Sequence, residues 1–97
     1  MPLSENVCRF KGILIEYSTR YVGNDDYLMG KGKLYLPGHR GEPGPSINLL
    51  AWEDVAKRLS EVGKDVWIEV GTSYTPETFR NKLIDNFVVG AFRVINE

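Results

Sequence analysis

The segment from Ile47 to Tyr74 constrains the fold more than any other part of the sequence. It reads INLLAWEDVAKRLSEVGKDVWIEVGTSY, in which a β-like stretch ending in tryptophan precedes a short helical pattern, a glycine and a second β-like stretch. Apolar residues recur at helical spacing at Val55, Ala56, Leu59 and Val62. Acidic residues stand at the start of this pattern and Gly63 just past its end, as helix termini favour. We therefore expect one helix over residues 53–62, between two strands, and find no other clear helix.

The remaining segments predict strands and the connections between them. β-Branched and aromatic residues predict strands over residues 7–17, 27–36, 46–52, 65–74 and 86–95. Gly12 indicates a bulge or bend within the first strand. The connections are a turn at residues 22–26, a mobile Gly/Pro-rich loop at Pro37–Pro45 and a polar connection at Thr75–Asp85.

The order of these elements, β-β-β-α-β-β, predicts the fold class. We expect a mainly β protein, a five-stranded Greek-key OB-fold barrel with one α-helix between strands 3 and 4. In that arrangement a short amphipathic helix bridges the third and fourth strands and closes the open end of the barrel. A small α+β sheet with one helix packed across it fits the same periodicity. In either case 97 residues suffice for one core, and we expect a single domain over residues 1–97.

Composition narrows the class of protein. No stretch approaches the roughly 18 apolar residues of a membrane span, and the first residues lack a signal-peptide pattern. The single cysteine, Cys8, allows no internal disulfide and no cysteine-built zinc site, which fits a reducing compartment. We expect a cytoplasmic protein without a metal or cofactor. The 12 basic and 13 acidic residues give no general attraction to nucleic acid.

The sequence offers little for catalysis. One histidine, His39, and one cysteine make a nucleophile–base pair improbable. The GKGK stretch at residues 30–33 lacks the spacing and the Ser or Thr of a phosphate-binding loop. We expect a protein that is not an enzyme.

The block INLLAWEDVAKRLSEVGKDVWIEV resembles the corresponding block of bacterial single-stranded DNA-binding proteins. The similar pieces are Trp52 at the end of a strand, the helix that follows, the Gly63-Lys64 turn and the VWIE strand. Upstream, RYVGND at residues 20–25 is similar to the family's turn between the first two strands, and KLYL at residues 33–36 to a short aromatic-containing strand. The similarity runs from about Gly12 to Tyr74 and rests on order and spacing.

Two departures from this family bear on function. The family's proteins carry a flexible tail ending in acidic residues, and these 97 residues show none. Ser46 and Asn48 stand about where the family shows an exposed aromatic residue. The resemblance is therefore to a tail-less or accessory relative, of the primosomal type. It implies the OB-fold and a homodimer or homotetramer, and supports these better than tight DNA binding.

Aromatic residues supply candidates for base stacking. Trp52 has the opposite parity to Ile47, Leu49 and Ala51 in its strand, so it faces outward if these three face the core. In the resembling family an aromatic residue at that position stacks a base; the competing interpretation is that Trp52 packs on the helix start. Tyr35 and Phe79 are secondary candidates. Tyr21 is a weaker one.

Trp67 is expected to point out of the barrel, because its parity is opposite to that of Val66 and Ile68. An exposed tryptophan on a strand commonly marks an interface. Because the resembling family forms oligomers through nearby strands, we predict that Trp67 lies in a contact between subunits.

The candidate phosphate-binding cations are Lys31, Lys33, Arg40, Arg80 and Lys82. Lys31 and Lys33 alternate with the same period as Tyr35 and so share its face of the strand. Arg40 lies in the loop at Pro37–Pro45, and Arg80 and Lys82 lie in the connection at Thr75–Asp85. The leading hypothesis is non-enzymatic binding of single-stranded DNA in replication, repair or recombination, by stacking and phosphate pairing. RNA is an equally suitable ligand for a stacking platform. The alternative is an OB-fold protein-interaction module without a nucleic acid ligand.

Overall fold

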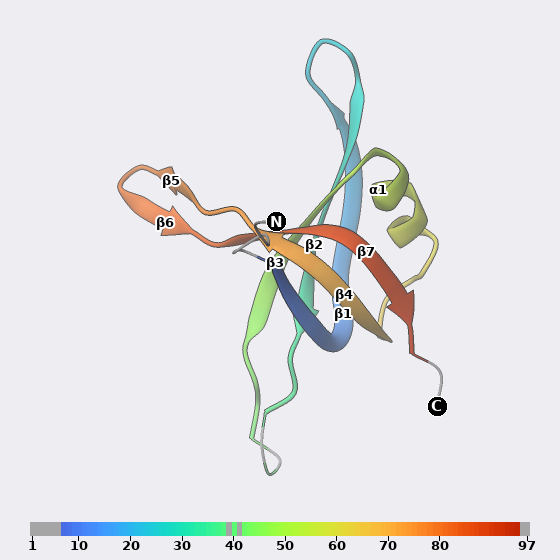
Figure 1. Cartoon of the computed structure of the whole chain (residues 1–97), viewed down its shortest axis with the longest axis vertical. Coiled ribbons are helices and arrows are strands. Elements are labelled where there is room, and N and C mark those ends of the chain that lie inside the picture. Colours follow the sequence, from blue (N-terminus) through green and yellow to red (C-terminus); the bar gives the residue numbers. More distant parts are fainter. Residues whose placement is uncertain (1–6, 39, 41, 96–97) are drawn as a thin grey trace, which may run out of the picture.

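The computed structural model describes residues 7–38, 40 and 42–95. Its elements, in chain order, are β1 (Val7–Val22), β2 (Tyr27–Tyr35), β3 (Ser46–Trp52), α1 (Glu53–Ser60), β4 (Val66–Tyr74), β5 (Glu77–Phe79), β6 (Lys82–Ile84) and β7 (Asn86–Val94). Five strands form a closed barrel in the order β1-β2-β3-β7-β4 (Figure 1). The predicted five-stranded barrel with a helix between its third and fourth strands is confirmed, and the open α+β sheet is wrong.

β1 is long because it pairs with both of its neighbours in the barrel, β2 and β4. Its first half pairs with β4 from Val7 to Leu14, and its second half pairs with β2 as far as Val22. The register with β2 shifts between Leu14 and Glu16, so the bulge lies at Ile15 and not at Gly12, where a bulge or bend was predicted. Gly12 has another role: a Cβ there would collide with the Tyr35 carbonyl oxygen, so the close approach of the two strands requires glycine.

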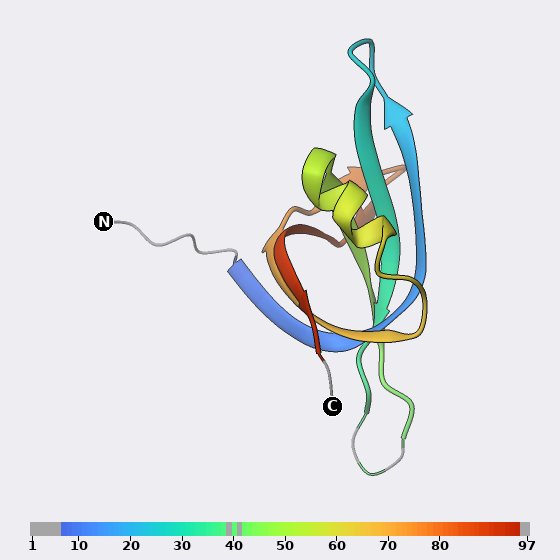
Figure 2. The ribbon, with the colours of Figure 1, turned by 90° about the vertical axis from the view of Figure 1, so that its right-hand side faces the viewer.

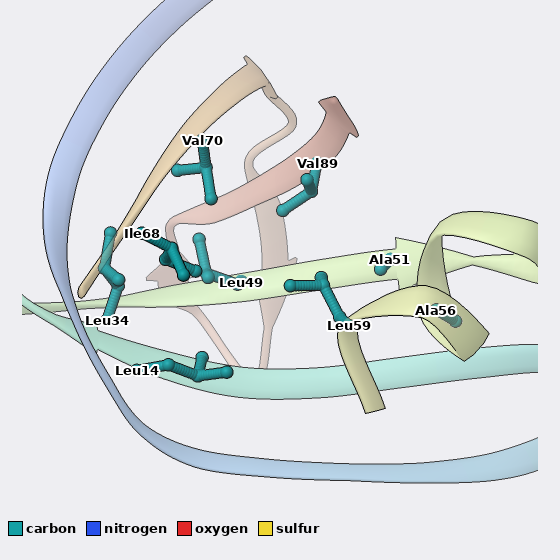
Figure 3. Packing of buried hydrophobic residues seen from close by; sticks show 9 residues of the cluster. All are labelled: Leu14, Leu34, Leu49, Ala51, Ala56, Leu59, Ile68, Val70 and Val89. Carbon is teal, nitrogen blue, oxygen red and sulfur yellow. The ribbon is translucent and has the colours of Figure 1, made fainter. Parts of the chain in front are cut away.

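The core fills the barrel and continues up to α1. Its buried residues are Leu14, Leu34, Leu49, Ala51, Ala56, Leu59, Ile68, Val70 and Val89 (Figure 3). Two of them, Ala56 and Leu59, belong to the helix, which covers one end of the barrel (Figure 2). The apolar face expected from the sequence is therefore the buried face, although the helix ends at Ser60 and not at residue 62.

Tyr17 ties the helix to the β1–β2 ladder. Its ring lies against Gly30 and Gly32, where side chains would collide with it, and its hydroxyl donates to the Ala56 carbonyl oxygen at 2.9 Å. Burial raises the pKa of Tyr17 to about 12, because the phenolate is poorly solvated there. This contact fixes which face of β2 is turned toward the helix.

The connection between β4 and β7 differs from the prediction. Thr75–Asp85 was expected to be a polar connection, but residues within it form the β5–β6 hairpin, which projects from the barrel (Figure 1). Arg80 and Asn81 turn the hairpin with positive φ angles of 52° and 64°, as a two-residue type I′ turn requires. The prediction was wrong because the segment lacks the usual Asn-Gly signal and its strands, only three residues each, bury little.

Candidate nucleic-acid interface

The outer face of β2 and β3 follows from their register. Directly opposed pairs, whose side chains share a face, are Met29 with Trp52, Lys31 with Leu50, Lys33 with Asn48, and Tyr35 with Ser46. The alternate residues Leu34, Leu49 and Ala51 are 1% exposed or less and face the core. Trp52, Lys31 and Lys33 therefore lie on one outer face.

Trp52 is available to a ligand on this face. Its side chain is 41% exposed, and although Trp52 is the N-cap residue of α1, its side chain makes no capping hydrogen bond. The backbone turns at Glu53, whose φ is 51°, and this sends the helix away from the strand direction. The exposure fits a stacking residue better than a helix-packing one, and the stacking role itself stays a prediction.

A chain of hollows runs over this part of the surface. One hollow, of about 420 Å³, is lined by Glu16, Tyr17, Ser18, Lys31, Gly32, Lys33, Asn48, Leu49, Lys64 and Asn86. It shares Lys31 with a hollow of about 250 Å³ toward the β1–β2 hairpin. It shares Asn48 with another of about 450 Å³ toward the base of the β5–β6 hairpin. We call this series the β2–β3 groove.

Positive charge predominates along the β2–β3 groove. Lys31, Lys33 and Lys64 line it, and Arg20 joins them because β1 pairs it with Met29, against the carboxylates of Glu16 and Asp85. The Glu16 carboxylate lies 4.0 Å from the Lys33 ammonium, with both side chains about half exposed or more. Such exposed pairs contribute roughly 0–1 kcal/mol, so a phosphate can displace the carboxylate at little cost.

Tyr35 is only partly available on the same face. The ring is half-buried, and the hydroxyl accepts a hydrogen bond from the Gly44 backbone N–H at 3.1 Å. Tyr35 thus anchors the connection that follows β2. Arg40, in that connection, is exposed with a φ of 55°, and it lines none of the three hollows.

Phe79, Arg80 and Lys82 line none of the three hollows of the groove. They lie at the turn end of the β5–β6 hairpin, where the Arg80 guanidinium stands 5.2 Å from the centre of the Phe79 ring. It is the base of this hairpin, through Leu83, that lines the groove beside Ser46 and Asn48. These three predicted residues border the site at most.

Trp67 lies on another side of the barrel, on β4, which pairs with β1 and β7. It is 38% exposed and stands opposite Ile13. On the same outer face the Glu69 carboxylate accepts a hydrogen bond from Arg93 at 2.7 Å, which lowers the pKa of Glu69. The predicted outward orientation agrees with this exposure, while the subunit contact remains a prediction.

Sequence reasoning missed several groove residues. Arg20, Met29, Asn86 and Leu83 were not among the candidates, and neither was Tyr27 on the same face of β2. The odd-numbered residues of β2, from 27 to 35, face the same side. This alternation was enough to predict that Tyr27 and Met29 share the face of Lys31 and Lys33. Leu83 had no signal, because it depends on a hairpin that the sequence did not indicate.

The described residues offer no metal site or membrane span. No group of three or more His, Cys, Asp or Glu side chains within residues 7–38, 40 and 42–95 is arranged to hold a metal ion. Nor does any helix of this described part have the length and apolar character to cross a membrane.

The closed barrel, its strand order and the helix at its end make this chain an OB-fold protein. Similar solved structures carry the same fold. The SSB domain of a Synechococcus protein superposes with a TM-score of 0.77 at 13% identity, covering 95% of this chain and 98% of that chain.

Two further solved structures are similar. A deletion mutant of the single-stranded DNA-binding protein from Thermus aquaticus gives a TM-score of 0.80 at 16% identity, covering 95% of this chain and 42% of that one. PriB from Ralstonia solanacearum gives 0.76 at 14% identity, covering 94% and 98%. No family model and no curated protein matches the sequence. At these identities the comparisons establish a shared fold.

Proposed function

We propose that this protein binds single-stranded DNA in the β2–β3 groove and catalyses no reaction. The observation that carries the proposal is the common outer face of Trp52, Lys31 and Lys33. Two proteins of the same fold support it, since one is a single-stranded DNA-binding protein and another carries an SSB domain. The processes served are replication, repair or recombination.

The mechanism combines stacking with phosphate pairing. A base stacks on the exposed indole of Trp52, which contributes roughly 1–3 kcal/mol without selecting a sequence. Lys31, Lys33 and Arg20 pair with phosphates along the same face. Each pairing releases counterions, so affinity falls as salt rises, by roughly 0.7 log units per phosphate per log unit of salt for single strands.

The test is a titration with oligo-dT, read by tryptophan fluorescence. Because both tryptophans are exposed, a Trp67→Phe background isolates the Trp52 signal. We expect quenching, and in an anisotropy assay with labelled oligo-dT we expect Trp52→Ala to weaken binding by roughly 5- to 150-fold.

Three outcomes would contradict the proposal: no quenching at low salt, an affinity insensitive to salt, or a Trp52→Ala variant that binds as well as the parent. An oligo-rU series in parallel separates DNA from RNA as the preferred ligand. Circular dichroism melting of each variant shows whether a weaker affinity reflects the groove or the fold.

We also propose that the Trp67 surface joins two copies of the chain into a homodimer or a larger homo-oligomer. Its support is a large exposed apolar side chain on a strand face away from the groove. The alternative function, a protein-interaction module without nucleic acid, rests on the same surface. Failure of the oligo-dT titration would favour it.

A further inference from the structure

The outer face of β2 continues past the end of β3. Tyr27 and Met29 share the parity of Lys31 and Lys33, and β2 pairs with β1 without a register shift from Lys33 to Tyr27. Leu28, of opposite parity, packs against the core. Tyr27 therefore faces the same side as the groove, on the part of the β1–β2 hairpin that projects beyond the barrel (Figure 1).

Met29 connects this projecting part to Trp52. It is opposed by Trp52 on β3 and by Arg20 on β1, so its side chain lies between an indole and a guanidinium. Only 9% of Met29 is exposed, whereas Trp52 and Arg20 are open to solvent. The hollow of about 250 Å³ at this place is lined by Ser18, Thr19, Arg20, Met29 and Lys31.

Tyr27 is the next aromatic residue along this face. It is 52% exposed, and two strand residues, about 6.7 Å, separate it from Met29. Because Trp52 is the register partner of Met29, Trp52 and Tyr27 are diagonal neighbours across β2 and β3, roughly 7–8 Å apart. This spacing suits neighbouring nucleotides of an extended strand, one stacked on Trp52 and the next on Tyr27. Beyond Tyr27 the turn carries Asp25 and Asp26, whose carboxylates repel phosphates and end the favourable surface.

From these observations we infer that the projecting β1–β2 hairpin is a second segment of the single-strand site, in which Tyr27 stacks a base and Arg20 pairs with a phosphate. The inference rests on the proposed function and extends it. The ligand thus leaves the barrel along the hairpin, and the full site is longer than the barrel face alone.

The hairpin supplies its own control. Tyr21 is also an exposed tyrosine, 69% against 52% for Tyr27, and it lies on the adjacent strand near the same turn. Its register partner is Leu28, so it points to the opposite face, toward the helix side. Tyr27→Ala and Tyr21→Ala therefore remove the same side chain from the same hairpin on two different faces.

The experiment measures the affinity of the parent, Tyr27→Ala, Tyr21→Ala and Tyr27→Phe for labelled oligo-dT of increasing length. We expect Tyr27→Ala to weaken binding of long oligomers by roughly 5- to 150-fold. The shortest oligomer that reaches full affinity should also become shorter by one or two nucleotides. Tyr21→Ala and Tyr27→Phe should remain within about twofold of the parent. An oligo-rU series shows whether the hairpin acts on RNA as well.

The control with Trp52→Ala separates the two proposals. If Trp52→Ala weakens binding while Tyr27→Ala behaves like Tyr21→Ala, the proposal of a second binding segment on the hairpin is wrong and the proposal of binding in the groove holds. If neither Trp52→Ala nor Tyr27→Ala has an effect, the proposed function itself fails. Equal losses in Tyr27→Ala and Tyr21→Ala would also overturn the hairpin segment, because they would show that the face does not matter.

Discussion

At the scale of single residues, Tyr17 both lines the groove and makes a structural contact with the helix. It crosses Gly30 and Gly32 of β2 and hydrogen-bonds the Ala56 carbonyl, so one side chain joins the ladder to the helix. We expect Tyr17→Phe to lower the free energy of unfolding by about 1 kcal/mol, the usual contribution of such a hydrogen bond. Chemical denaturation of the variant and of Tyr21→Phe, an exposed control, measures this difference.

The same residue predicts a dependence on pH. The unfolded tyrosine ionises near its ordinary pKa of 10.0, whereas burial holds the folded pKa at about 12. Between these values the unfolded chain loses the proton first, so stability falls as pH rises from 10 to 12. Denaturation across this range should show a shallower fall for Tyr17→Phe than for the parent. A fall of equal steepness in both would contradict the assignment.

Residue parity could be predicted from the sequence where strands are regular. The outward orientation of Trp52 and Trp67, and the shared face of Lys31 and Lys33, follow from alternation alone. What the sequence could not supply is proximity between strands. Arg20 joins the groove only through its pairing with Met29, and that register depends on the bulge at Ile15.

At the scale of elements, the β1–β2 ladder depends on glycine. A Cβ at Gly32 would stand 2.5 Å from the Glu16 carbonyl oxygen and 2.8 Å from the Tyr17 ring. We expect Gly32→Ala to destabilise the protein by about 1–3 kcal/mol, because backbone and the half-buried Tyr17 ring must both move. Gly71 in β4 is the matched control, since a Cβ there would meet its nearest atom at 3.9 Å.

Thermal or chemical denaturation of Gly32→Ala and Gly71→Ala makes the comparison. Gly71→Ala should be neutral within about 0.5 kcal/mol. Similar stability of the two variants would show that the close approach at Gly32 is not a constraint.

Elements with a buried face were predictable, and elements without one were not. The barrel strands and α1 carry apolar periodicity because one side of each meets the core. β5 and β6 have mostly exposed residues, so their pairing left no pattern to detect. Gly12 was assigned to a bulge or bend because a strand glycine fits either of these or a close approach, and only the structure distinguishes them.

At the scale of the whole molecule, the two exposed tryptophans lie on different sides of the barrel and carry different proposals. We expect Trp67→Glu to shift the protein toward monomer, because a carboxylate cannot be buried between subunits without a partner. Trp52→Glu should keep the oligomer and lose DNA affinity. Sedimentation velocity of both variants, at matched concentration, measures the first effect.

The opposite result would exchange the roles of the two surfaces. A monomeric Trp52→Glu beside an oligomeric Trp67→Glu would mean that the groove face is the subunit contact. A monomeric parent protein would exclude self-association through either tryptophan.

The barrel has one seam that differs from the others. β3 and β7 meet as the only parallel neighbours among the described barrel strands, and they share three register pairs, from Asn48–Asn86 to Leu50–Val88. Parallel pairing is slightly weaker per residue, so we expect this short junction to be the part of the barrel that opens most readily. Asn48 and Asn86 also line the groove. A nucleic-acid strand bound there would contact both β3 and β7 and hold them together. Binding of the ligand and closure of the barrel would therefore reinforce each other.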